Sequence, residues 1–213
     1  MQSKKNISMS VIKRLPRYYR FLGNLGKKNI ERISSLELSR QMGLTASQIR
    51  QDLNCFGGFG QQGYGYNVKM LYEEIGAILG VNNKNKTILI GTGNLGQAIA
   101  RHMSFEMRGF NIIGIFDRED SLVGTELRGL RVQSTDSLES FCKENSPLVA
   151  VLCVPNTMET EELIDLLVDC GIRAFWNFTH IDIKAKYPDV CVENVHLSDS
   201  LMTLCYQVNM LKK

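Results

Sequence analysis

Residues 87–100 contain a complete dinucleotide fingerprint, with the pattern Gly-Thr-Gly-Asn-Leu-Gly at positions 91–96. The apolar run over 87–90 predicts a buried parallel strand, and residues 94 to about 108 predict a helix. In such a turn the first glycine permits a tight bend, the second lets backbone approach a pyrophosphate, and the third allows close packing of helix on strand. The helix N-terminus then presents free N–H groups to phosphate.

A second apolar run over 111–116 ends in Asp117, 21 residues beyond Gly96. An acid at this position accepts hydrogen bonds from ribose hydroxyls and disfavours a 2′-phosphate. Arg118 leaves NADP open, because a guanidinium can pair with that phosphate. We therefore predict NADH or NAD⁺ as the ligand, and as its binding residues Gly91, Thr92, Gly93, Asn94, Leu95, Gly96, Asp117 and Arg118.

Two further apolar segments, residues 148–154 and 174–177, predict additional strands. In doubly wound sheets the ligand lies outside the carboxyl ends of the strands, so Val154 and Pro155 are expected on the nicotinamide side. Asn177 ends the second segment, and its side chain could bond a carboxamide. An asparagine at a strand end that caps a turn is an equal alternative.

The chain of 213 residues can form one large or two small domains. No apolar run reaches the roughly 18 residues that span a bilayer, and the N-terminus lacks the apolar core of a signal peptide. We therefore expect a cytoplasmic protein with no membrane partner. Six cysteines without Cys-x-x-Cys spacing and three scattered histidines give little material for a metal site, and none is predicted.

Charge is distributed unevenly along the chain. Residues 1–82 carry 12 Lys and Arg against 5 Asp and Glu, whereas residues 83–213 carry 13 against 17. This asymmetry favours a module for a polyanion joined to a neutral or acidic module. A merely solvated basic surface is the alternative on charge alone.

The pattern of the basic segment, residues 1–82, predicts a helix-turn-helix. After a helix over 10–26 that Pro16 kinks or restarts, the segments 34–37 and 45–48 form capping boxes on two short helices separated by Gly43. Two capped helices across a glycine turn are typical of this motif, whose second helix enters the major groove. The residues expected to contact DNA from that helix are Ser47, Gln48, Arg50, Gln51 and Asn54.

Residues 56–66 hold five glycines interleaved with aromatic residues. Glycines permit positive φ angles and a tight hairpin, so this segment predicts a wing beside the recognition helix. Its polar side chains, Gln61, Gln62 and Tyr64, are expected on the phosphate backbone or minor groove. A disordered linker is the alternative.

The chain closely resembles the Rex family of bacterial redox-sensing transcriptional repressors. The resemblance covers nearly the whole chain and is carried by residues 14–20 (Arg-Leu-Pro-Arg-Tyr-Tyr-Arg), by 47–53 (Ser-Gln-Ile-Arg-Gln-Asp-Leu), by the glycine-rich segment 56–66 and by the fingerprint at 91–96. It implies a winged-helix domain fused to a Rossmann domain, a homodimer on palindromic operators, and release of DNA when NADH binds.

Three departures from the family pattern qualify that resemblance. Family members often have Lys in place of Gln51 and basic residues in place of Gln61 and Gln62, so we expect fewer phosphate contacts here. Many members have an acid where this chain has His196, so an interdomain ion pair at that position is not carried over. The resemblance also implies that the amphipathic helix over 198–211 is swapped between subunits, although the sequence equally permits packing on its own domain.

The sequence thus predicts an α/β protein with a winged-helix DNA-binding domain over 1–82, its helix-turn-helix and wing at about 18–66. A doubly wound NAD(H)-binding domain follows over 83–213 and ends in a dimerisation helix at 198–211. The predicted function is a repressor that binds double-stranded operator DNA as a homodimer and senses the NADH/NAD⁺ ratio. The alternative is an NAD-dependent oxidoreductase with an accessory basic domain. An oxidoreductase needs a substrate domain and a proton-transferring group, which the remaining segments do not supply, so no catalytic residue is predicted.

Overall fold

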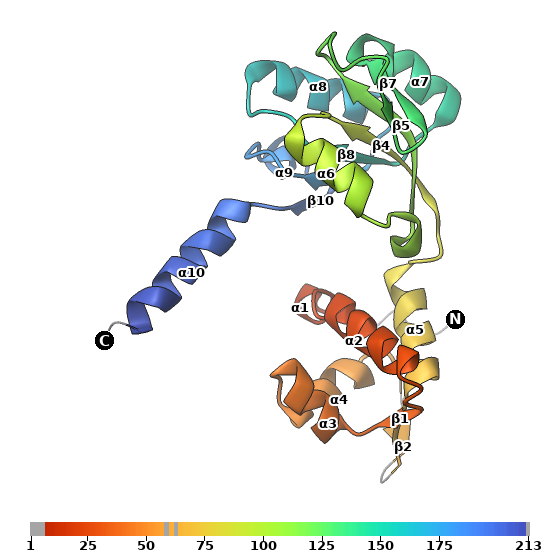
Figure 1. Ribbon diagram of the computed structural model, residues 1–213, viewed down its shortest axis with the longest axis vertical. Coiled ribbons are helices and arrows are strands. Elements are labelled where there is room, and N and C mark those ends of the chain that lie inside the picture. The colour runs from red at the N-terminus through yellow and green to blue at the C-terminus, as the bar shows by residue number, and fades with distance from the viewer. Residues whose placement is uncertain (1–6, 58–59, 62–63, 212–213) are drawn as a thin grey trace. The chain divides into compact units, whose positions relative to one another are not determined.

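A computed structural model of the chain describes residues 7–57, 60–61 and 64–211. The chain divides into two compact units, Met1–Asn82 (unit 1) and Asn83–Lys213 (unit 2). Each unit has its own hydrophobic core and is described by itself (Figure 1).

Unit 1 is a winged-helix fold. Its helices are α1 (Met9–Ile12), α2 (Leu15–Lys27), α3 (Ser35–Met42), α4 (Ala46–Asn54) and α5 (Val68–Leu79), and its strands are β1 (Arg32–Ile33), β2 (Gly60–Gln61) and β3 (Gly65–Asn67). The three strands form an antiparallel sheet in the order β1-β3-β2. Helices α3 and α4 therefore form the predicted helix-turn-helix, and β2 and β3 pair as the predicted hairpin beside them.

The core of unit 1 is built from one apolar stripe on each helix. Leu15 and Leu22 of α2, Leu38 of α3 and Ile49 of α4 are fully buried. Helix α2 packs along α5, where the rings of Tyr19 and Tyr72 stack with their centroids 4.2 Å apart. The recognition helix α4 thus packs into one core with residues of α2, α3 and α5.

One local prediction in unit 1 is confirmed and another needs correction. The helix expected over 10–26 restarts at Pro16 as predicted: α1 ends at Ile12 and α2 begins at Leu15, with Pro16 in its first turn, where its missing N–H costs nothing. The capping box at Ser34 and Glu37 is complete, but the one at Thr45 is only half formed. The Thr45 hydroxyl accepts the Gln48 backbone N–H, while the Gln48 side chain turns instead to Asp52.

A buried carboxylate ties α4 to α2. Asp52 is 1% exposed and accepts two hydrogen bonds of 2.7 Å from Arg14, one of 2.9 Å from the Tyr18 hydroxyl and one of 2.8 Å from the Gln48 amide. Burial raises the pKa of Asp52, but the hydrogen bonds from Arg14, Gln48 and Tyr18 outweigh it and bring that pKa below its ordinary value. Asp52 is therefore ionised at neutral pH and fully coordinated by donors.

Unit 2 is a doubly wound Rossmann domain. Its seven-stranded sheet has the order β10-β9-β8-β4-β5-β7-β6, in which all pairs are parallel except β6 with β7. Counted from β4, the parallel strands follow the order 3-2-1-4-5-6 that is typical of dinucleotide-binding domains. The strands are β4 (Asn85–Ile90), β5 (Phe110–Asp117), β6 (Glu126–Leu127), β7 (Leu130–Ser134), β8 (Val149–Leu152), β9 (Ala174–Asn177) and β10 (Cys191–Asn194).

Helices cover both faces of this sheet, and successive strand residues alternate between the two cores. Ile88 and Ile90 of β4 pack under α7 (Leu138–Asn145), α8 (Met158–Asp169) and α9 (Ile183–Lys186), whereas Leu89 packs under α6 (Asn94–His102). Figure 1 shows α6 lying across the sheet. On the α6 side, Trp176 and Phe178 beside β9 are only half-buried, so this part of the face is incompletely covered.

The fingerprint helix is shorter than predicted. It ends at His102, and Arg108 belongs to a separate 3-10 turn, η1 (Glu106–Arg108). The Arg128 guanidinium donates to the carbonyl groups of Ala100 and Met103, at 2.9 and 3.0 Å, and so satisfies the end of α6.

Helix α10 (Leu197–Leu211) ends the described chain with no buried residue. Leu197, Leu201, Leu204, Val208 and Leu211 recur along one face, and Met202, Tyr206 and Met210 recur every fourth residue along another. Among the residues with described positions, no helix is long and apolar enough to cross a membrane, and no three His, Cys, Asp or Glu side chains are grouped as metal ligands.

The Asp52 cluster predicts a specific loss of stability. Arg14→Met leaves the buried carboxylate without its cationic partner and is expected to destabilise unit 1 by about 3 kcal/mol at pH 7. Because the folded pKa of Asp52 is lowered, its contribution is present above the unfolded value of about 3.9 and disappears as pH falls through the folded value. The difference between variant and wild type should therefore shrink below about pH 4.

Hydrogen exchange of the α2 and α4 amides measures this change in unit 1 separately from unit 2. Arg17→Met, at an exposed position in the first turn of α2, is the matched control and should change little. Equal effects of the two substitutions would show that the Asp52 cluster does not stabilise unit 1.

Candidate functional site

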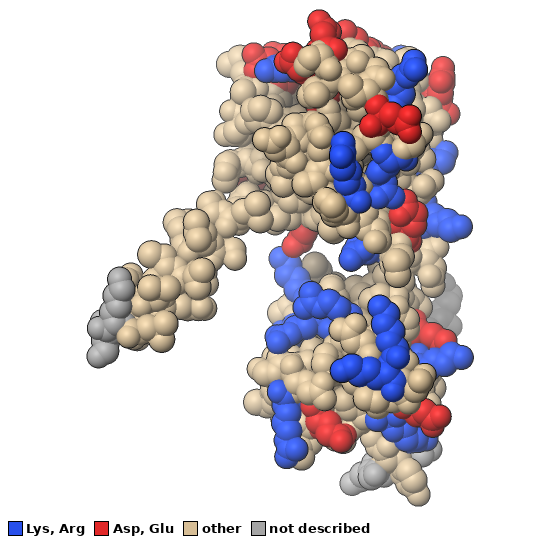
Figure 2. Space-filling view, in the orientation of Figure 1, with Lys and Arg blue, Asp and Glu red and all other residues tan. Residues whose placement is uncertain are grey.

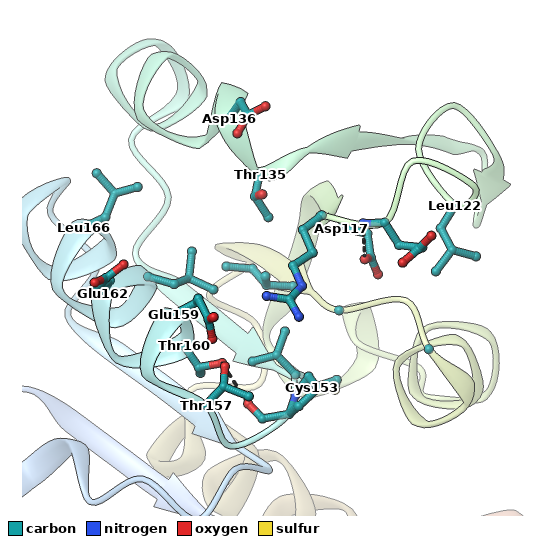
Figure 3. Close-up of a pocket in the computed structure, with 18 of the residues that line it drawn as sticks. Asp117, Leu122, Thr135, Asp136, Cys153, Thr157, Glu159, Thr160, Glu162 and Leu166 are labelled. Atoms are coloured by element: carbon teal, nitrogen blue, oxygen red, sulfur yellow. Dashed lines mark hydrogen bonds between the residues drawn. The ribbon is translucent and has the colours of Figure 1, made fainter.

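A cleft of about 830 Å³ lies outside the carboxyl ends of β4, β5 and β8. Its volume is in the range of sites for cofactor-sized ligands, and its place is the point where the strand order reverses. Figure 3 shows Asp117 and Leu122 on one side of the cleft and the α8 residues Glu159 and Thr160 on the other. The predicted residues that line it are Gly91, Gly93, Asn94, Leu95, Asp117, Arg118, Val154 and Pro155.

Each of the three fingerprint positions is occupied by glycine for a different physical reason. Gly91 has φ +91°, and a Cβ atom there would lie 2.5 Å from the Cys153 carbonyl oxygen. At Gly96 a Cβ atom would lie 1.8 Å from the Gly91 carbonyl oxygen. At Gly93 it would meet nothing within 4 Å. The first and third glycines are thus required by the fold, whereas the second leaves open space that a ligand can use.

Asp117 anchors the glycine turn as well as lining the cleft. Its carboxylate accepts the Thr92 backbone N–H, the Thr92 hydroxyl at 2.7 Å and the Glu119 N–H at 3.0 Å. Burial raises the pKa of Asp117, but these hydrogen bonds more than offset burial, so its pKa lies below the ordinary value. Thr92 itself is buried under the turn. The sequence pattern identified the acid but not this second role.

The rim of the cleft is acidic. Among the described residues that line it, Arg118 is the one cation, and the acids besides Asp117 are Glu119, Asp136, Glu139, Glu159 and Glu162. The pKa of Glu159 is lowered, chiefly by a hydrogen bond from Thr157, with a smaller contribution from the charge of Arg118. Sequence reasoning missed these rim acids.

Asn177 does not face the cleft. It is fully buried, its Nδ2 donates to the Ile181 carbonyl and to Asn194, and its Oδ1 accepts from the backbone and hydroxyl of Thr179. All of its hydrogen-bonding groups are used by the turn after β9 and by Asn194 at the end of β10, so the predicted carboxamide contact is not supported and the turn-capping alternative holds. Cys153 does line the cleft, where burial raises the pKa of its thiol to about 12 and keeps it neutral.

The predicted DNA-facing residues lie on α4 and around the hairpin. Ser47, Arg50, Gln51 and Asn54 are exposed, and Arg50 also donates to the Ser35 hydroxyl at 3.1 Å. Gln48 is half-buried against Asp52. Figure 2 shows that Lys and Arg side chains are numerous on the visible surface of unit 1.

In the wing, the exposed ring of Tyr64 lies 6.0 Å from the Arg32 guanidinium, and Arg32 also donates to the Tyr64 carbonyl. Gln61 is in β2, and Gln62 lies outside the described residues.

Comparison with known proteins agrees with both units. Residues 6–54 match a family model described as "Putative DNA-binding protein N-terminus", and residues 82–181 match one described as "CoA binding domain". The redox-sensing transcriptional repressor Rex of Clostridium perfringens is 52% identical over 98% of this chain and 98% of its own. Its counterpart in Thermoanaerobacter pseudethanolicus is 53% identical over 98% and 92%. The chain belongs to the Rex family of redox-sensing transcriptional repressors.

Solved structures of Rex proteins share the fold of this chain. The crystal structure of RSP in complex with β-NAD⁺ and operator DNA matches with a TM-score of 0.89 and 52% identity over 98% of this chain and 95% of that one. The structure of RSP with β-NADH matches with a TM-score of 0.88 and 49% identity over 98% and 97%. Rex proteins are regulators rather than enzymes, so the oxidoreductase alternative is set aside.

The open space at Gly93 predicts a variant that separates binding from folding. Gly93→Val should fill the pyrophosphate site and weaken NADH binding by more than about 3 kcal/mol, the scale of two lost hydrogen bonds to a charged group. Its effect on stability should stay within about 1 kcal/mol, because a Cβ atom at this position meets no protein atom within 4 Å. Calorimetric titration with NADH and thermal unfolding measure the two effects.

Gly96→Ala is the contrasting variant. Its Cβ atom collides with the Gly91 carbonyl, so we expect loss of the folded unit itself. A Gly93→Val protein that binds NADH as tightly as the wild type would show that the pyrophosphate does not occupy this turn.

Proposed function

We propose that this chain represses transcription by binding palindromic operator DNA through unit 1, and that NADH bound in the cleft of unit 2 releases it. The observation that carries the proposal is a dinucleotide cleft and a basic winged helix in one chain of the Rex family. One similar structure contains β-NAD⁺ and operator DNA together, which supports NADH as the releasing form. Such a protein works in the cytoplasm, where DNA and the NADH pool meet.

In this proposal Ser47, Arg50, Gln51 and Asn54 of α4 contact bases or phosphates, and the wing, with Tyr64 at its exposed end, contacts the backbone or minor groove. Four observations support the assignment of DNA binding to residues 1–82: the exposed polar face of α4, the packing of its other face into the core of unit 1, the adjoining hairpin and the excess of positive charge. Arg50 is the strongest candidate for a base-edge contact, since a guanidinium pairs with guanine through two hydrogen bonds.

The nucleotide half of the proposal assigns the pyrophosphate to the turn at 91–96 and the N-terminus of α6, and the adenosine ribose to Asp117. Support comes from the open space at Gly93 and the position of Asp117 at the cleft. Val154 and Pro155 then line the nicotinamide side. The ligand acts here as a signal, because a repressor has no substrate to reduce.

We further propose that the functional form is a homodimer joined through α10. Two apolar faces on a helix with no buried residue require a partner surface, and unit 2 leaves Trp176 and Phe178 half-buried beside β9. Two-fold symmetry also suits the DNA, because one recognition helix reads few bases and a dimer places two of them on a palindrome.

The switch is tested by thermodynamic reciprocity. If NADH prefers the conformation that does not bind DNA, operator DNA must weaken NADH binding by the same factor by which NADH weakens operator binding, typically 5- to 150-fold. The operator is a duplex selected by the wild-type protein from a random library, and fluorescence anisotropy measures both affinities. Gly93→Val should keep operator affinity but need far more NADH for release. Release of this variant at the wild-type NADH concentration would contradict the proposed sensor.

The dimer is tested by sedimentation at micromolar concentration. The wild type should sediment as a dimer, whereas Leu201→Glu combined with Leu204→Glu should give a monomer, because two charges enter the apolar face of α10. Gln207→Glu, which adds a charge to the polar side of the same helix, should remain dimeric. A monomeric wild type that still binds its operator as one chain would refute the assembly.

A further inference from the structure

The side chain of Gln48, a predicted DNA contact, is held by a buried carboxylate within the fold. Its Nε2 donates to Asp52 Oδ1 at 2.8 Å, and among the described residues none donates to its Oε1. The residue is half-buried and lies in the first turn of α4, the part of a recognition helix that reaches base edges. Gln51 lies three residues further along α4, is exposed, and has the same amide group without a hydrogen bond to a carboxylate of the described residues.

The chemistry of Asp52 decides which end of the Gln48 amide faces outward. An ionised carboxylate only accepts hydrogen bonds, so the amide nitrogen must face it. The lowered pKa of Asp52 keeps the group ionised, and burial together with the hydrogen bond to Asp52 raises the pKa of Tyr18, so that hydroxyl stays a donor. Arg14 holds both carboxylate oxygens in place. The amide of Gln48 therefore cannot reverse at low cost.

We infer that Asp52 fixes Gln48 with its Oε1 toward the major groove, where this acceptor selects a base that offers an exocyclic amine, adenine or cytosine. In the major groove adenine N6 and cytosine N4 are donors, whereas guanine O6 and thymine O4 are acceptors that would oppose the Gln48 oxygen. The inference rests on the proposed DNA binding and refines it: Gln48 reads a base, and Asp52 is its positioning residue.

A glutamine whose amide is free can rotate and present either its oxygen or its nitrogen, so it tolerates both kinds of base. The Asp52 cluster removes that freedom before DNA is bound. The selection then depends on the orientation of one base pair, because reversing an A·T or C·G pair exchanges the amine for a carbonyl at the same place.

The experiment uses full-length protein and a duplex that the wild type selects from a random library. Each base pair of the half-site is reversed in turn, and at the responding position adenine or cytosine is also replaced by its analogue that lacks the exocyclic amino group. We expect the wild type to lose about tenfold in affinity with the reversed pair, and a measurable part of that with the analogue. Gln48→Ala should bind all duplexes altered at that position equally well.

Gln51→Ala is the matched control and should keep the amine preference at the Gln48 position. Asp52→Asn tests whether Asp52 fixes the orientation of the Gln48 amide, because an asparagine amide can offer Gln48 either a donor or an acceptor. Circular dichroism checks the fold of this variant. A folded Asp52→Asn protein should bind with a reduced preference between amine and carbonyl.

Retention of every wild-type base preference by Gln48→Ala would overturn the inference, and so would a folded Asp52→Asn protein with undiminished preference. Should Asp52→Asn fail to fold, the Gln48→Ala comparison decides alone. A wild type that selects no duplex would refute the proposed function, which is a different outcome from a selected duplex that Gln48 does not read.

Discussion

The nucleotide site depends on how closely the first turn of α6 approaches the end of β4. Gly96 sits against the carbonyl of Gly91 with no room for a Cβ atom, and Asp117 at the end of β5 holds Thr92 through its backbone and its hydroxyl. These contacts fix the direction of the helix and leave Gly93 facing open space. The cleft is therefore preorganised: the protein satisfies the turn by itself, and a phosphate has only to enter it.

Unit 1 uses a buried charge for a similar purpose. The Asp52 carboxylate is surrounded by donors from α4, from α2 and from the residue that precedes α2, and it fixes one side chain of the recognition helix while it joins the helices. A pair of apolar side chains of similar volume could join the helices equally well. What a hydrogen-bonded carboxylate adds is direction, because it allows only one orientation of the amide that contacts it.

The sequence predicted the order of elements and most of their bounds where the pattern is local. The glycine turn and the Ser34 capping box depend on neighbouring residues alone, and each is present. Short strands with little periodicity, such as β7 and β10, were not predicted, because they are defined by the strands they pair with.

The candidate site could be predicted only as far as its motifs extend. The residues of the fingerprint and the acid Asp117 follow from their spacing, and Asn177 follows from its place at a strand end. Whether an asparagine there bonds a ligand or its own turn depends on residues 179, 181 and 194, which no local pattern connects with it. The same holds for Gln48, whose expected capping role is replaced by a contact with a carboxylate that only tertiary packing brings into play.

The acidic rim of the cleft has a consequence for how ionic conditions influence the protein. In the proposed function a dinucleotide carries negative phosphates past Glu119, Asp136, Glu139, Glu159 and Glu162, and exposed charges of like sign repel less as salt screens them. The basic surface of unit 1 has the opposite dependence, because contacts with DNA phosphates weaken as salt rises. Higher salt thus eases entry of the nucleotide and weakens DNA binding at the same time. The response of the protein to the NADH/NAD⁺ ratio therefore depends on the ionic strength of the cell.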